Sequence, residues 1–120
     1  MTPLILALLA ATPTQTQADL NRDASDGYAR ADRVMTVQWQ RTYAAMKRRD
    51  AADTTRGGGF GYAAATLASQ RAWLAYRDKQ CVIEGGEFAG GSMQPMARAQ
   101  CLARLTRERT AQLTKMMWQR

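Results

Sequence analysis

The sequence contains no histidine and only two cysteines among its 120 residues. Without histidine the chain cannot form a Ser-His-Asp triad, a Cys-His pair or a metal site with imidazole ligands. Two thiolates are also too few for a structural four-cysteine zinc site. The composition therefore favours a non-enzymatic protein that needs neither a metal nor a cofactor.

Long apolar runs are also absent, and none approaches the roughly 20 residues that a transmembrane helix requires. The apolar stretch at residues 4–11 is followed by a polar segment with Pro13 and then by Ala18, before the first charged residue. An apolar core, a helix-breaking segment and a small residue are typical of a secretory signal peptide. We therefore expect residues 1–18 to be a signal peptide and residues 19–120 to form a periplasmic or secreted domain. The alternative is a frayed apolar tail on a cytosolic protein, since no basic residue follows Met1.

Alternation of apolar and polar residues never reaches the length of a strand, whereas apolar residues recur at steps of three and four in three segments. This periodicity predicts helices over residues 19–49, over 62–84 and from 95 onward. Glycine-bearing breaks at 50–61 and 87–94 separate them. The sequence thus predicts an all-α fold, a small antiparallel bundle of one long helix and a two-helix hairpin. The stripe of the first segment comprises Leu20, Ala24, Tyr28, Ala31, Met35, Trp39, Thr42 and Met46.

The two cysteines lie on the two helices of the predicted hairpin, Cys81 near the end of one and Cys101 early in the next. Antiparallel packing would bring these turns side by side, and an oxidising compartment would favour a disulfide. Two buried free thiols or a redox-active pair are the competing interpretations. The spacing is not that of a Cys-x-x-Cys motif, which disfavours a catalytic thiol.

Basic residues exceed acidic ones, 17 to 10, for a net charge of +7. The excess is concentrated after residue 88, where Glu108 is the single acid. Such a segment is typical of a solvated helix face, and it could also attach the protein to anionic polymers. Export would remove cytosolic nucleic acid as a partner. The six basic residues of this segment are Arg98, Arg104, Arg107, Arg109, Lys115 and Arg120.

A motif runs through the second and third segments, in the order W-x-x-Y-R-D-x-x-C-x-x-E, G-S, C-L and L-T-x-x-R-x-x-x-L. This order resembles the lysozyme inhibitor LprI-like N-terminal domain family, whose members are mostly small, exported, helical bacterial proteins. The resemblance implies an LprI-like helical domain over residues 19–120 and suggests a role in lysozyme inhibition. The motif residues that we single out, besides the cysteines, are Trp73, Tyr76, Arg77, Asp78, Glu84 and Arg109.

These motif residues fit structural roles better than catalytic ones. Trp73 and Tyr76 at helical spacing are expected to bury a large apolar area in the core. Asp78 and Glu84 lie about 240° apart around a helix axis, which makes a poor glycosidase pair. We expect Glu84 instead to pair with Arg109 of the third helix and so to fix the register of the hairpin.

Two functions of different classes follow from these observations. The first is a non-enzymatic binding protein that inhibits a lysozyme, or binds another envelope or host protein, by placing a loop arginine in an acidic cleft. Arg56, beside three glycines, and Arg98, near the glycine-serine break, are the candidate residues. The alternative is an envelope structural or stress protein that binds anionic polymers through its basic third helix.

Overall fold

Three α-helices form the computed structural model, which describes residues 1–5 and 14–118. They are α1 (Gln17–Ala52), α2 (Tyr62–Gly86) and α3 (Gln94–Lys115), and the described residues include no strand. The predicted all-α fold is therefore confirmed, with helix bounds within a few residues of those expected. Residues 6–13, in the predicted signal peptide, lie outside the described part. No helix within it is long and apolar enough to cross a membrane.

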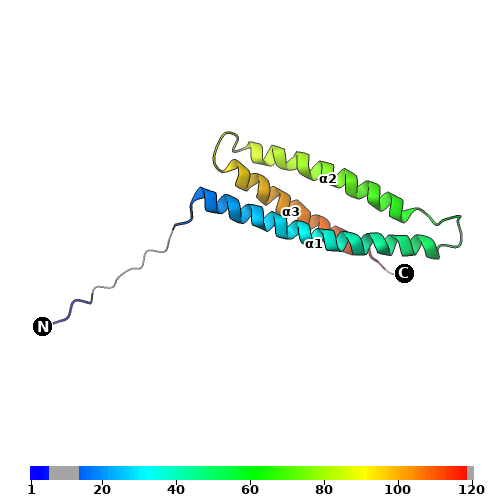
Figure 1. Ribbon diagram of the computed structural model, residues 1–120, viewed down its shortest axis with the longest axis horizontal. Helices are drawn as coiled ribbons and strands as arrows, with labels where there is room; N and C mark the ends of the chain where they lie inside the picture. The colour runs from blue at the N-terminus through cyan, green and yellow to red at the C-terminus, as the bar shows by residue number, and fades with distance from the viewer. Residues whose placement is uncertain (6–13, 119–120) are drawn as a thin grey trace.

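The helices lie side by side in an up-down-up arrangement (Figure 1). The parallel alignment of α1 and α3 is fixed at both ends. Asn21 Nδ2 donates to the Ser92 carbonyl at 3.0 Å near one end, and the buried Thr42 hydroxyl donates to the Leu113 carbonyl at 2.9 Å near the other. Because α1 and α2 extend beyond the end of α3, the loop that joins them projects from that end of the bundle (Figure 1).

The first helix begins two residues earlier than the sequence pattern predicts because Thr16 and Asp19 form a capping box. The Thr16 hydroxyl accepts the Asp19 N–H at 3.1 Å, and the Asp19 carboxylate accepts the Thr16 N–H at 3.1 Å. Two backbone donors that have no partner within the helix are thereby satisfied. The cap residue falls inside the predicted signal peptide, so the expected cleavage after Ala18 would remove it.

The core is centred on the disulfide between α2 and α3. Cys81 and Cys101 are bonded, with their Cα atoms 5.5 Å apart, and both are almost fully buried. Leu102 and Leu105 complete this cluster, against which Tyr28 and Trp73 pack. The two helices approach closely beside it, because a Cβ atom built at Gly85 would lie 3.1 Å from the Arg98 Cβ. The disulfide that the sequence favours over two free thiols or a redox-active pair is therefore confirmed.

Aromatic rings and guanidinium groups alternate through the middle of the bundle. The Arg77 guanidinium carbon lies 5.4 Å from the centre of the Tyr28 ring and 5.3 Å from that of the Trp73 ring. The Arg109 guanidinium carbon lies 5.8 Å from the same Trp73 ring. Each helix contributes to this cation–π stack, and both arginines are buried. Tyr76, in contrast, is 55% exposed, so the expectation that it is buried with Trp73 is wrong.

We predict that replacing both cysteines, Cys81→Ser with Cys101→Ser, lowers the free energy of unfolding by about 3 kcal/mol. The bond closes a segment with a sequence separation of 20, and its loss restores conformational freedom to the unfolded chain. Urea unfolding followed by circular dichroism measures the change. An unchanged midpoint in the double variant would contradict the prediction.

We also predict that Trp73→Ala lowers the free energy of unfolding by about 3 kcal/mol, the lower end of the range for buried tryptophan, because the ring is half-buried. Tyr76→Ala, three residues along the same helix, provides the control and should change stability by no more than about 0.5 kcal/mol. Both are measured by chemical denaturation. Equal losses would show that the stack around Trp73 contributes nothing specific.

Candidate functional site

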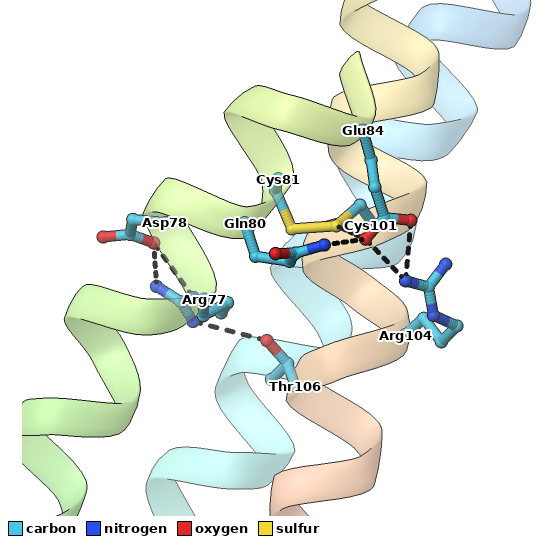
Figure 2. The surroundings of a disulfide bond; sticks show 8 residues. All are labelled: Arg77, Asp78, Gln80, Cys81, Glu84, Cys101, Arg104 and Thr106. Carbon is cyan, nitrogen blue, oxygen red and sulfur yellow. Dashed lines mark hydrogen bonds and ion pairs between the residues drawn. A yellow bond between two sulfur atoms is a disulfide. The ribbon is translucent and has the colours of Figure 1, made fainter. Parts of the chain in front are cut away.

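The motif carboxylates are engaged in contacts that hold the helices together. Glu84 lies beside the disulfide, where its two oxygens accept hydrogen bonds from Arg104 Nη2 at 2.8 and 2.9 Å (Figure 2). This guanidinium lowers the pKa of Glu84. The expected pairing of Glu84 with Arg109 is therefore wrong. Arg109 lies eight residues beyond Cys101 and thus about 12 Å further along α3, alongside the first half of α2 rather than its end.

Arg77 and Asp78 form a second structural contact, about two turns earlier in α2. Arg77 donates from Nε to the Asp78 carboxylate at 3.0 Å and from Nη1 to the Thr106 hydroxyl at 3.3 Å (Figure 2). Its Nη1 also lies 3.6 Å from an Asp32 carboxylate oxygen of α1. The guanidinium thus joins all three helices. Since Asp78 and Glu84 each face a different arginine, they do not form a carboxylate pair that could act on a glycosidic bond.

Arg109 is buried among neutral partners and is not available to a ligand at the surface. Its guanidinium donates to the side-chain oxygens of Gln70 at 2.9 Å and Ser69 at 3.1 Å, and also to Gln112. Burial lowers the pKa of this guanidinium. With Arg104 paired and Arg109 buried, the third helix presents fewer free cations than its sequence suggests. Arg120 lies outside the described residues.

The loop between α1 and α2, residues 53–61, is anchored by Asp50 where it meets α2. The Asp50 carboxylate accepts the backbone N–H groups of Gly61 at 3.0 Å, Tyr62 at 2.9 Å and Ala63 at 2.9 Å. These hydrogen bonds, led by that of Ala63, lower the pKa of Asp50. Because the N-cap residue Gly61 has no side chain, a carboxylate from the preceding helix satisfies the first donors of α2. The sequence analysis missed this role, which an acid before a loop that ends in glycine could have indicated.

Glycine is required where the loop passes over the end of α1. Gly59 has a φ of +85°, which other residues rarely adopt, and a Cβ atom at this position would lie 2.5 Å from the Asp50 carbonyl oxygen. The backbone of the loop can therefore rest directly on that of α1. Together with the Asp50 hydrogen bonds, this contact anchors the last residues of the projecting loop to the end of α1.

Arg56 lies on this projection with 56% of its side chain exposed. It is paired loosely with Asp53, at an N–O distance of 3.6 Å, and its guanidinium carbon lies 5.3 Å from the Phe60 ring centre. Phe60 is itself 59% exposed, so the loop offers a cation and an aromatic ring together. Arg49 supports the base of the loop by stacking between Tyr62 and Trp118.

Arg98, the second candidate, lies at the opposite end of the bundle. It is an exposed residue in the first turns of α3, packed against Gly85 through its Cβ atom. The α1–α2 loop and the start of α3 are at opposite ends of the molecule (Figure 1). The structure therefore does not bring Arg56 and Arg98 together, and one narrow cleft cannot receive both.

The anchoring of the loop generates a prediction about pH. A carboxyl group whose pKa is lowered in the folded state stabilises the fold above its ordinary pKa, 3.8, and this contribution is lost as the pH falls through the lowered value. We expect Asp50→Asn to be less stable than wild type at pH 7, and the difference to shrink below about pH 4, when the wild-type carboxylate is protonated. Thermal unfolding between pH 2 and 7 measures both.

Asp26→Asn is the matched control, because it removes the same charge from an exposed position of α1. Its thermal stability should match that of the wild type at every pH tested. If Asp50→Asn and Asp26→Asn behave alike, the hydrogen bonds to the start of α2 contribute no net stability.

Comparison with known proteins shows which family this sequence matches. The family model described as "Lysozyme inhibitor LprI" matches residues 9–113, a span that contains α1, α2 and nearly all of α3. An uncharacterized protein of Rhizobium meliloti (strain 1021) is 44% identical over 105 residues, which cover 84% of this chain and 73% of that protein. No solved structure matches. On this match, the chain belongs to the lysozyme inhibitor LprI family.

Proposed function

We propose that this protein is an exported, non-enzymatic inhibitor that plugs the acidic cleft of a lysozyme with its α1–α2 loop. The observation that carries the proposal is the exposed Arg56–Phe60 pair on a projecting loop whose end is anchored by Asp50. Family membership supports the class of target. The uncharged apolar start of the chain and its disulfide support a periplasmic or secreted location.

The chemistry of a lysozyme cleft suits this loop. Such a cleft contains one carboxyl group with a raised pKa and one ionised carboxylate, and a guanidinium can form a charge-assisted, bidentate contact with the ionised one. Arginine and aromatic residues also dominate the binding energy of protein interfaces. Arg56 and Phe60 are therefore suitable anchors for a cleft of this kind.

Two features reduce the free-energy cost of binding. The end of the loop is already anchored to α1, so less conformational entropy is lost when the loop enters a cleft. The present partner of Arg56 is Asp53, at 3.6 Å, in a long contact in which 56% of the Arg56 side chain is exposed. Exposed ion pairs contribute roughly 0–1 kcal/mol, so Arg56 can exchange this carboxylate for that of the enzyme at small cost.

We predict that Arg56→Ala weakens inhibition by about 2–5 kcal/mol, because the enzyme's carboxylate is left buried and unpaired. The lower figure corresponds to a rise of roughly 30-fold in the inhibition constant. The assay is lysis of bacterial cell walls by lysozymes of several classes at moderate salt, with increasing inhibitor. Stability should change by no more than about 0.5 kcal/mol.

The matched control is Arg71→Ala, which removes an exposed arginine from α2 and leaves the loop intact. It should inhibit as well as the wild type. If the two variants inhibit equally well, Arg56 is not the inserted residue. If the wild-type protein inhibits no class of lysozyme, the proposed function itself is wrong.

A further inference from the structure

A shallow groove follows α1 along the flank where it meets α3 and the C-terminal residues. It consists of four hollows with volumes of ≈ 340, 340, 370 and 420 Å³, and no residue of α2 lines any of them. Neighbouring hollows share lining residues: first Val34, then Val37 with Arg41, then Arg48 with Met117. The hollows therefore follow one another along the same flank of α1, and we refer to this row of hollows as the groove.

The charge of this groove has one sign only. No aspartate or glutamate lines any of its hollows, whereas α1 and α3 supply several arginines. Among the described residues, the salt bridges of the protein involve none of these arginines. Their guanidinium groups thus have no salt-bridge partner within the described part of the chain. The lining arginines are Arg30, Arg33, Arg41, Arg48, Arg49 and Arg107.

The groove also has an apolar floor. Val34 is 60% exposed and Val37 is 48% exposed, and Ala44 continues their line toward the end of α1. Together with Arg30, Arg41 and Arg48, these residues occupy positions 30, 34, 37, 41, 44 and 48. Steps of four and three place all six on one stripe of the helix. At 1.5 Å per residue, the stripe is about 27 Å long.

We propose that this groove binds an acidic amphipathic helix of a partner protein. A rod-shaped ligand can follow this row of shallow hollows along α1. A helix with apolar residues at steps of three and four would cover the exposed valines, whereas a uniformly hydrophilic polyanion would leave them in water. Acidic residues seven apart on that helix repeat every 10.5 Å or so, the same interval that separates Arg41 from Arg48 along α1.

This site differs in position and in partner from the proposed lysozyme contact. The groove runs along the side of α1, whereas Arg56 lies on the loop beyond its end. A second copy of the chain is a poor occupant, since two molecules of charge +7 repel each other. The groove therefore suits an acidic protein, and Arg56→Ala should leave its binding unchanged.

The probe for this proposal is a fluorescein-labelled synthetic helix of 21 residues or so, three heptads with leucine at positions a and d and glutamate at e and g. Fluorescence anisotropy at moderate salt measures its affinity. Relative to wild type, we expect Arg41→Glu with Arg48→Glu to weaken binding at least tenfold, and Val34→Ser with Val37→Ser at least threefold. Arg71→Glu with Lys79→Glu, an equal change of charge at exposed positions of α2, should alter it less than threefold.

Two further ligands are tested, labelled polyglutamate of the same length and vesicles of phosphatidylglycerol. Far-ultraviolet circular dichroism of each variant checks that it is folded. Binding of the helix but not of polyglutamate or vesicles supports the proposal. Equal binding of polyglutamate, with no effect of the valine substitutions, would make the groove a polyanion site and overturn it. Equal weakening by the α1 and α2 charge variants would overturn the proposal in favour of an effect of net charge alone. Failure of the wild-type protein to bind the helix would also overturn the proposal.

Discussion

The alternating stack of Tyr28, Arg77, Trp73 and Arg109 is the constraint on which the rest of the bundle depends. Two guanidinium groups are buried in a small core, and burying a charge is costly unless its hydrogen bonds are satisfied. Arg77 meets this requirement with carboxylates, whereas Arg109 uses only neutral oxygens. These partners come from specific turns of each helix, so the three helices cannot slide or rotate without leaving a buried cation unpaired. The disulfide fixes one end of the hairpin, and the stack fixes its relation to α1.

Much of the fold follows from the sequence because it is encoded locally. Apolar periodicity, the glycine-bearing breaks and Pro95 in the first turn of α3 are short-range signals, and they locate the three helices to within a few residues. The choice of side-chain partner is not local. Glu84 pairs with Arg104 rather than Arg109 because the register of α3 against α2 decides which arginine is near. Tyr76 is exposed because α3 covers only one side of α2, and the side that is covered is likewise decided by how the helices pack.

The candidate site was predictable in part. A loop arginine beside consecutive glycines is visible in the sequence, and the structure places Arg56 on a projecting loop as that pattern suggests. Phe60 gives the loop its aromatic anchor, and Asp50 holds the end of the loop against α1. Both residues act through contacts that only the folded chain reveals. The basic surface shows the opposite case. The sequence places it on the third helix, but ion pairing and burial there leave the free arginines mainly along α1.

The way in which α2 begins has a consequence for the dynamics of the chain. Its first backbone donors depend on a carboxylate that belongs to the last turns of α1, across the intervening loop. Fraying of α1 at Asp50 therefore exposes the amides of residues 61–63, although these belong to a different helix. We therefore expect the end of α1 and the start of α2 to open together. The amide protons of Gly61, Tyr62 and Ala63 should exchange with solvent at a common rate set by the opening of α1.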